Sequence, residues 1–375
     1  MASTGQQAPG SGGKVRMHSE SAGTGTIYRA RAPLRLSFAG GGTDVPPYPA
    51  LRGGAVVSGT INRYAFASLL VRPGSSVRIE SMDLGKSVEI YDERDLDFDG
   101  TVDLAKAVIR RMGGKAILGK RTFLLLHTEA PPGTGLGSSS AAVVAMLGAF
   151  SLWLDRPMEP KDIASLAWSI EREDLRIPGG YQDQSASVYG GFNFIEMDGS
   201  SVLVHPIRVS HDFVNELNYG LVLCYVGKGD RHSGIIQDQV DRVQSGVKEA
   251  LDALDETKAL AFQMRNAFTR GDLNAVGSLL DEAWNAKKRF APGTSTPLLD
   301  RIYEGARSAG ALGGKVTGAG GGGHMLFYCH PEHRWDLVRF LDSMNLQVVP
   351  FSFEPQGLQT WRVDSWELNK KSVTT

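Results

Sequence analysis

The sequence predicts an α+β protein built from two domains. Its 375 residues are enough for about two or three domains with separate cores. Segments typical of strands and of helices are mixed without the regular strand-helix alternation of a doubly wound sheet. Near residue 206 the pattern changes, and long helices with a polar face predominate from there on. We therefore expect an N-terminal domain over 27–205 and a C-terminal domain over 206–366.

The two ends of the chain are expected to lie outside these domains. Residues 1–26 are rich in Gly, Ser, Thr and Gln and have almost no apolar side chains. Such a segment cannot bury enough apolar surface to offset the entropy of ordering it. We expect a disordered tail or an expression tag at 1–26 and a flexible tail at 367–375.

The overall charge argues against polyanionic partners. Lys and Arg number 40 and Asp and Glu 41, which leaves a formal charge of −1, so we expect no nucleic acid partner. No run approaches the roughly 18 apolar residues of a membrane span, so we expect no membrane partner either. Two cysteines in so long a chain, and a start without a signal-peptide core, favour a cytoplasmic protein. A homodimer is left open.

In the N-terminal domain, strands are predicted where Val, Ile, Tyr and Phe are frequent and alternate with polar residues. These runs are 28–40, 55–71, 77–82 and 121–130, followed by a hairpin of 190–197 with 201–207. Helices are predicted at 103–112, 138–154 and 161–175. Three serines, which are good N-caps, open the second helix, and the run from Ile177 to Gly180 ends the third.

The C-terminal domain begins with a predicted strand at 217–227. Apolar residues at three-four spacing then predict a largely helical layer over 233–290. Further helices are expected at 298–310 and 333–344, and further strands at 324–329 and 347–353.

The strongest chemical signal is the run PPGTGLGSSS from Pro131 to Ser140, between a predicted strand and an apolar helix. Glycines let the backbone approach a bulky anion, and the helix N-terminus supplies the positive end of a dipole. The serine hydroxyls are able to ligate a Mg²⁺ ion that bridges nucleotide phosphates. The run therefore predicts a phosphate-binding loop, and a glycine-rich turn with a serine cap is the alternative.

Three other features carry weaker signals. The run from Gly318 to Gly323 satisfies the dinucleotide pattern but leads into a strand, which favours a loop in close contact with a substrate or another loop. Asp183 is expected in a loop just after the helix-ending Pro178, and Glu171 on the preceding helix. Either acid could serve catalysis, or act as a cap or a solvated side chain.

Three segments in order, 32–44 (APLRLSFAGGGTD), 131–142 and 315–323 (KVTGAGGGG), resemble the three motifs of the GHMP kinase superfamily. The resemblance covers about 27–365. It implies a two-domain GHMP kinase-like fold with the active site in the cleft between the domains. It also implies an ATP-dependent sugar kinase, that is, a phosphotransferase with an alcohol group as acceptor, with ATP and Mg²⁺ as cofactors.

The resemblance also implies roles for individual residues. Asp183 would accept or steer the proton of the acceptor hydroxyl, with Arg35 beside the transfer site. Ser139, Ser140 and Glu171 would hold Mg²⁺, with Glu173 as the competing choice for the carboxylate. The ATP phosphates would contact Pro132, Gly133, Thr134, Gly135, Leu136, Gly137, Ser138, Ser139 and Ser140. The acceptor would contact Gly41, Gly42, Thr43, Asp44, Gly179, Gly180, Asp183, Arg231, Gly320 and Gly321.

The acceptor implied by the resemblance is a sugar phosphate. Gly41 and Gly42 stand where galactokinase-like members have Glu-His, which would open room for a longer sugar. The pattern is most similar to members that phosphorylate the anomeric (C1) hydroxyl of D-glycero-D-manno-heptose 7-phosphate and give the 1,7-bisphosphate. Candidate cations for its phosphate are Arg231, Lys287, Lys288 and Arg289. The alternatives are an anomeric kinase for fucose or a hexose, and a non-catalytic sugar and nucleotide sensor.

Overall fold

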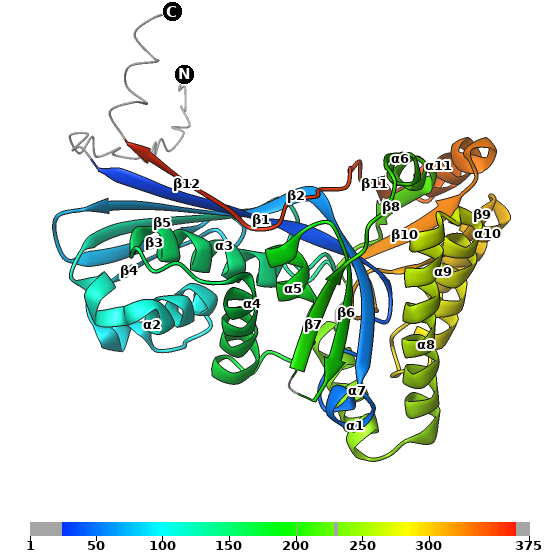
Figure 1. Ribbon diagram of the computed structural model, residues 1–375, viewed down its shortest axis with the longest axis horizontal. Helices are drawn as coiled ribbons and strands as arrows, with labels where there is room; N and C mark the ends of the chain where they lie inside the picture. Colours follow the sequence, from blue (N-terminus) through cyan, green and yellow to red (C-terminus); the bar gives the residue numbers. More distant parts are fainter. Residues whose placement is uncertain (1–24, 200, 229–231, 365–375) are drawn as a thin grey trace, which may run out of the picture.

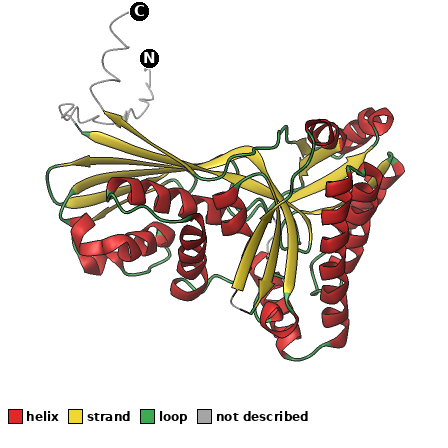
Figure 2. Ribbon diagram, in the orientation of Figure 1, coloured by secondary structure: helices red, strands yellow, loops and turns green. Residues whose placement is uncertain are grey.

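The computed structural model describes residues 25–199, 201–228 and 232–364. They form two sheets with helices packed on both (Figure 1). Figure 2 shows the long strands of the larger sheet on one side and a layer of long helices on the other. Every helix in these ranges is too short or too polar to cross a lipid bilayer.

The larger sheet contains eight described strands, and its longest member, β2, joins two arms. The order is β12-β1-β2-β5-β3-β4, and β2 pairs with β6, which pairs with β7. Residues 65–72 of β2 pair with β5, whereas residues 54–59 pair with β6. The strands are β1 (Thr26–Ala39), β2 (Gly54–Arg72), β3 (Ser76–Ser81), β4 (Lys86–Ile90), β5 (Arg121–Thr128), β6 (Phe192–Asp198), β7 (Ser201–Pro206) and β12 (Gln359–Asp364).

Four helices, α2 (Asp103–Leu118), α3 (Ser138–Trp153), α4 (Pro160–Ser169) and α5 (Gln182–Tyr189), pack in the region of this sheet. Helix α3 contacts β1 and β2 and also α2, α4 and α5, which explains why it is apolar on nearly all sides. A single π-helical turn, Ile170–Asp174, follows α4 directly. The remaining short elements here are α1 (Tyr48–Arg52) and a 3₁₀ turn at Glu93–Leu96.

The second sheet has the order β11-β8-β10-β9 and lies against the long helices. Its strands are β8 (Leu221–Tyr225), β9 (Ala311–Val316), β10 (His324–Cys329) and β11 (Gln347–Val348). The helices are α6 (His211–Gly220), α7 (His232–Gln244), α8 (Lys248–Arg270), α9 (Leu273–Lys287), α10 (Pro297–Ser308) and α11 (Arg334–Ser343), with a 3₁₀ turn at Pro331–His333.

Strand β1 is where the two parts of the molecule meet. Helices α3 and α5 contact it, and so do α8 and α9 from the second part. The second half of β1, from Ala32 to Ala39, is therefore buried at every position. The side chains of this half of the strand, including that of Arg35, are therefore shielded from bulk water.

The α+β class and most predicted elements are confirmed, with corrections at particular segments. The strand expected at 217–227 is shorter, because its first four residues complete α6. Of the strand expected at 347–353, only Gln347–Val348 forms. Asp183 does not lie in a loop but in the first turn of α5. Elements α1, α5, α6, β4, β9 and β12 were not expected from the sequence.

The last strand returns to the larger sheet. β12 pairs antiparallel with β1, with Gln359 opposite Arg31 and Asp364 opposite Thr26. Just before it, Leu358 packs on α3, where a Cβ added to Gly148 would lie 2.8 Å from its Cδ1. This segment falls within the range 206–366 that the sequence suggested for the C-terminal domain, yet it pairs with strands of the N-terminal one.

Candidate active site

A cavity opens where loops from both parts of the molecule converge on β1. The residues that line it come from β1 and the following loop, the phosphate-binding loop, the π turn, the start of α5, the end of α9 and the glycine loop after β9. They include Arg35, Ser37, Gly41, Gly42, Asp44, Gly133, Gly135, Gly137, Ser138, Ser139, Ser140, Glu171, Arg172, Gly179, Gly180, Gln182, Asp183, Lys287, Lys315, Thr317 and Gly318.

In the predicted phosphate-binding loop, 131–140, alternate residues face the cavity and the protein interior. Gly133, Gly135 and Gly137 line the cavity with φ angles of +80°, +84° and +75°, a region that glycine adopts without strain. Thr134 and Leu136 are turned into the protein, and the Thr134 hydroxyl donates to the carbonyl of Pro131 (2.8 Å).

The two glycine loops touch at Gly135. A Cβ there would lie 2.9 Å from the amide nitrogen of Gly318. The carbonyl of Gly135 accepts hydrogen bonds from Arg35 Nη1 (2.5 Å) and Thr317 Oγ1 (2.9 Å). The phosphate-binding loop is thus tied both to β1 and to the second part of the molecule.

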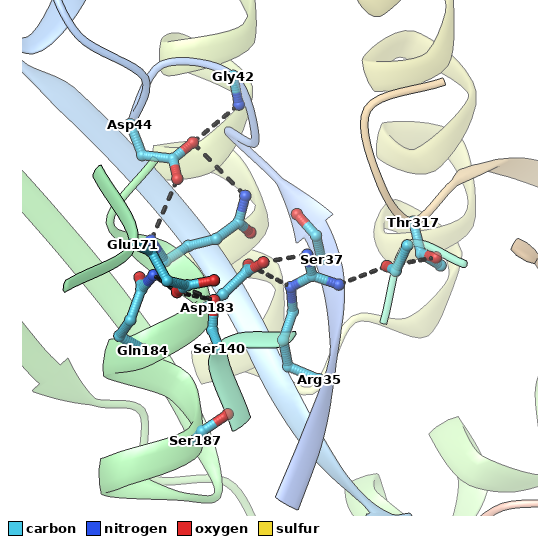
Figure 3. Close-up of polar contacts among 12 residues, drawn as sticks. Arg35, Ser37, Gly42, Asp44, Ser140, Glu171, Asp183, Gln184, Ser187 and Thr317 are labelled. Carbon is cyan, nitrogen blue, oxygen red and sulfur yellow. Dashed lines mark hydrogen bonds and ion pairs between the residues drawn. The ribbon is translucent and has the colours of Figure 1, made fainter. Parts of the chain in front are cut away.

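Ser139, Ser140 and Glu171 meet at the N-terminus of α3, and Figure 3 shows Ser140 and Glu171 together with Gln184. Ser139 Oγ donates to Glu171 Oε1 (2.8 Å) and Ser140 Oγ to Oε2 (2.6 Å). Gln184 on α5 donates from Nε2 to the same Oε2 and to Ser140 Oγ. Glu173 instead is exposed and accepts from Ser169, so the structure groups the serines with Glu171 and not with Glu173.

This oxygen-only set fits a hard cation such as Mg²⁺, which prefers carboxylate and phosphate oxygens. Within the described ranges, no three His, Cys, Asp or Glu side chains form a group able to hold a metal ion. A Mg²⁺ ion here would therefore take ligands from a bound phosphate as well as from Glu171 and the two serines.

Arg35 and Asp183 form an ion pair against the phosphate-binding loop. Arg35 donates from Nε to Oδ1 of Asp183 (2.9 Å), and its Nη2 lies 2.8 Å from the same oxygen as an ion pair. A Cβ added to Gly137 would lie 3.4 Å from Asp183 Cγ and 3.5 Å from Arg35 Cγ. The carboxylate is about one-quarter exposed, whereas the arginine is buried. The pair therefore presents an oriented carboxylate next to the site expected for the donor phosphates.

Asp44 is a second, fully buried carboxylate. It accepts hydrogen bonds from the amide nitrogens of Gly42 (2.9 Å) and Gln182 (3.1 Å). Burial raises the pKa of Asp44, and the negative charge of Asp183 adds to this. Gly180 is packed so closely on this carboxylate that a Cβ would lie 1.9 Å from Oδ2.

The loop glycines and other predicted acceptor residues differ in where they face. A Cβ on Gly41 would lie 2.8 Å from Ser37 Oγ, inside the cavity wall. Gly42 has φ +109° and its Cβ would lie 2.5 Å from the ring of Phe290, so its missing side chain opens no room for a longer sugar. A Cβ on Gly179 would meet the guanidinium of Arg172 at 2.6 Å, and both line the cavity.

Three predicted acceptor contacts are not supported by the structure. Thr43 is fully buried, and its hydroxyl donates to the carbonyls of Gly40 and Ala55. Gly320 and Gly321 pack on Thr294 and Ile235, so Thr317 and Gly318 of the same loop line the cavity in their place. Arg231 lies outside the described residues.

The cations of the site come partly from positions that motif analysis missed. Of the basic candidates near the end of α9, only Lys287 lines the cavity within the described ranges. Arg289 pairs with Glu256 on the outside, and the Lys288 ammonium lies over the rings of Trp284 and Tyr303.

Lys287 was among the candidate cations, and its spacing in the sequence could have set it apart from Lys288 and Arg289. It continues the series Val276, Leu280, Ala283 and Trp284, which is the buried face of α9. Lys315, on β9, is a further cavity cation that was not singled out.

Comparisons with known proteins show two matching family models and several similar sequences. The model "GHMP kinases N terminal domain" matches residues 101–191, and the model "GHMP kinases C terminal" matches 264–343. A curated D-glycero-alpha-D-manno-heptose 7-phosphate kinase of Campylobacter jejuni is 35% identical over 89% of this chain and 99% of its own. An L-fucokinase/L-fucose-1-P guanylyltransferase of Bacteroides fragilis is 28% identical over 80% of this chain and 34% of its own.

Solved structures of other proteins have the same fold. The crystal structure of a D-glycero-D-manno-heptose 1-phosphate kinase from Bacteroides thetaiotaomicron superposes with a TM-score of 0.75 at 32% identity, covering 90% of this chain and 99% of its own. A galactokinase from Lactococcus lactis in complex with galactose has a TM-score of 0.70 at 18% identity, covering 89% and 95%. The second likeness concerns the fold alone.

Proposed function

The chain belongs to the GHMP kinase family, and on this basis we propose that it phosphorylates the anomeric hydroxyl of D-glycero-D-manno-heptose 7-phosphate at the expense of ATP. The product would be the 1,7-bisphosphate. The observation that carries this proposal is the cavity, which brings together the Arg35 and Asp183 pair, the glycine-rich loop and the buried Lys287 and Lys315. The 35% identity to a heptose 7-phosphate kinase over nearly the whole chain supports the choice of sugar.

The nucleotide would lie along the phosphate-binding loop. Next to that loop is a mainly apolar pocket that includes Pro132, Leu126, Met146 and Leu175, and it suits a flat purine base. From there the phosphates would extend over Gly133 to Gly137, toward the free amide groups at the start of α3. A bound Mg²⁺ would neutralise the charge that develops on the transferred phosphoryl group.

Asp183 would receive the proton of the acceptor hydroxyl. The anomeric oxygen forms a bond to the γ-phosphorus, the bond from that phosphorus to the bridging oxygen breaks, and ADP leaves. The hydroxyl proton passes to the Asp183 carboxylate and then to solvent. Arg35 holds this carboxylate by a hydrogen bond from Nε and an ion pair from Nη2. Its positive charge beside the phosphate-binding loop would stabilise the charge on the transferring group.

The main alternative is an anomeric kinase for an unphosphorylated sugar. The 28% identity to an L-fucokinase/L-fucose-1-P guanylyltransferase supports this alternative. A non-catalytic sensor is disfavoured, because the residues that catalysis would need are present in two bonded groups. Ser139 and Ser140 are bonded to Glu171, and Arg35 is paired with Asp183.

The test is a coupled ADP-release assay with heptose 7-phosphate, free heptose, fucose and galactose as acceptors. We expect the highest kcat/KM for heptose 7-phosphate, with a new anomeric phosphate in the phosphorus NMR spectrum of the product. Equal or better turnover of fucose or a hexose would replace this proposal with the alternative kinase. No turnover of any acceptor would favour the sensor.

A further inference from the structure

Two lysine ammonium groups are buried in the cavity wall without a carboxylate partner among the described residues. Lys287 is 6% exposed, and no described group accepts a hydrogen bond from its Nζ. Lys315 is 3% exposed, and its Nζ donates to the carbonyl of Ser37 (2.7 Å). Burying a cation without a counter-charge is unfavourable, so such groups normally have a partner.

The charged groups around the lysines do not supply that partner. Arg35 already pairs with Asp183, and Asp44 is held by backbone amides with no described ion pair to either lysine. Burial lowers the pKa of Lys287 to about 8. The negative charge of Asp44 opposes this decrease, and the positive charge of Arg35 adds to it. Burial also lowers the pKa of Lys315 well below its ordinary value, and the charges of Lys287 and Arg35 lower it further. Apart from the buried Asp44, the charges that act on Lys287 and Lys315 are positive, so these cations repel one another.

The position of Lys287 assigns it to the acceptor and not to the nucleotide. Its Nζ lies 5.2 Å from the centre of the Phe290 ring, and this ring contacts Gly42 in the loop after β1. The donor loop has a different neighbouring cation, since Lys228 Cε lies 3.8 Å from where a Cβ on Gly133 would be.

We propose that Lys287 and Lys315 bind the phosphate that the acceptor already carries and so select a sugar phosphate over a free sugar. This proposal rests on the proposed function, and it names the groups that would bind the acceptor's negative charge. Arg35 is bonded to Asp183 and to the carbonyl of Gly135, and Arg172 donates from Nη1 to the carbonyl of Ile177. The two ammonium groups carry no such bond to a carboxylate and are therefore the charged donors that we assign to a phosphate dianion.

The test compares Lys287→Met with the neighbouring variant Lys288→Met, whose ammonium lies over aromatic rings away from the cavity. For heptose 7-phosphate, we expect Lys287→Met to raise KM by about 10- to 100-fold, the value of one charge-assisted contact. Its KM values for free heptose and for ATP should stay within about twofold of wild type. Lys287→Arg should restore part of the discrimination, because it keeps the charge.

Two results would overturn the assignment. One is an equal loss with phosphorylated and free heptose, and the other is a raised KM for ATP. If the wild type does not use heptose 7-phosphate at all, the proposed function fails on that measurement alone. The lysine site is then tested by calorimetry with inorganic phosphate on protein saturated with a non-hydrolysable ATP analogue. Phosphate binding that Lys287→Met abolishes and Lys288→Met retains supports the site, and binding that both retain refutes it.

Discussion

Asp183 is the side chain on which turnover should depend most. In Asp183→Asn, the amide oxygen still accepts from Arg35, so the local geometry is kept while the basic carboxylate is lost. We expect kcat to fall by about 10²-fold or more, the usual contribution of a positioned general base. Turnover and ATP affinity by calorimetry should be measured in parallel. Near-normal turnover with unchanged ATP binding would remove Asp183 from the mechanism.

Glu171 and Glu173 offer a matched pair for the metal. Only Glu171 contacts the two serines at the start of α3, whereas Glu173 bonds to Ser169. Glu171→Gln should therefore raise the Mg²⁺ concentration needed for half-maximal activity, while Glu173→Gln should leave it near the wild-type value. The measurement is a Mg²⁺ titration at saturating substrates, and the reverse order would reassign the ligand.

Lys287 should lower the stability of the protein without ligand. Its pKa is near 8 in the fold and about 10.5 when unfolded, so the folded state holds the proton less tightly. The unfavourable effect is fully present below pH 8 and is relieved as the pH rises from about 8 to 10.5. We expect Lys287→Met to raise the free energy of unfolding by about 3 kcal/mol near pH 7. Urea denaturation at neutral and alkaline pH checks this, and a destabilised variant at neutral pH would contradict it.

Single residues were predictable where their chemistry lies in a short local run. The phosphate-binding loop, Arg35 and Asp44 follow from contiguous motifs, and the structure brings them to one cavity. Gly42 was also singled out, but its role depends on Phe290, which is far away in the sequence and contacts it only in the fold. Lys315 was missed for the same reason, because its position in the cavity depends on a hydrogen bond to the carbonyl of Ser37 on another strand.

At the scale of elements, α5 places Gln182 and Asp183 in the wall of the cavity. Its sequence, QDQSASVY, has no apolar stripe, and it is buried through small side chains such as Ser185, Ala186 and Ser187. Periodicity therefore gave no signal, and the segment was expected to be a loop. The sequence also did not predict the π turn after α4, which carries the buried Glu171.

The start of α5 depends on Gly180. A Cβ there would overlap Oδ2 of Asp44 at 1.9 Å, so Gly180→Ala must displace the carboxylate or the helix. We expect kcat/KM for the acceptor to fall by about 10²-fold, as a shift of about 1 Å can cause. The control is Gly119→Ala at the end of α2, where the nearest atom would be 3.5 Å away. Steady-state kinetics of both variants test this, and unchanged acceptor kinetics in Gly180→Ala would contradict the close packing.

At the scale of the whole molecule, the two ends of the described chain are joined through β12. The pairing of Thr26 with Asp364 links positions more than three hundred residues apart, and no local pattern predicts which strand such a segment joins. The sequence thus indicated two domains and most of their elements, but not that the last strand completes the larger sheet.

Removing this strand should destabilise the protein. A chain ending at Gln356 loses β12 and the packing of Leu358 on α3. It also leaves the first half of β1 as an open edge. We expect a loss of about 2 kcal/mol or more, because the truncation removes both the half-buried Leu358 and the strand pairing of β12 with β1. A chain ending at Asp364 is the control. Urea denaturation of both should separate them, and equal stability would show that β12 contributes little.

The burial of Lys287 and Lys315 also bears on how a substrate is captured. The chain carries a formal charge of −1, and these cations lie beneath the surface, so little long-range attraction draws in an anionic sugar. Arrival at the opening is then governed by diffusion and is similar for sugars with and without a phosphate. The difference between them arises after entry, as a longer residence time of the phosphorylated sugar.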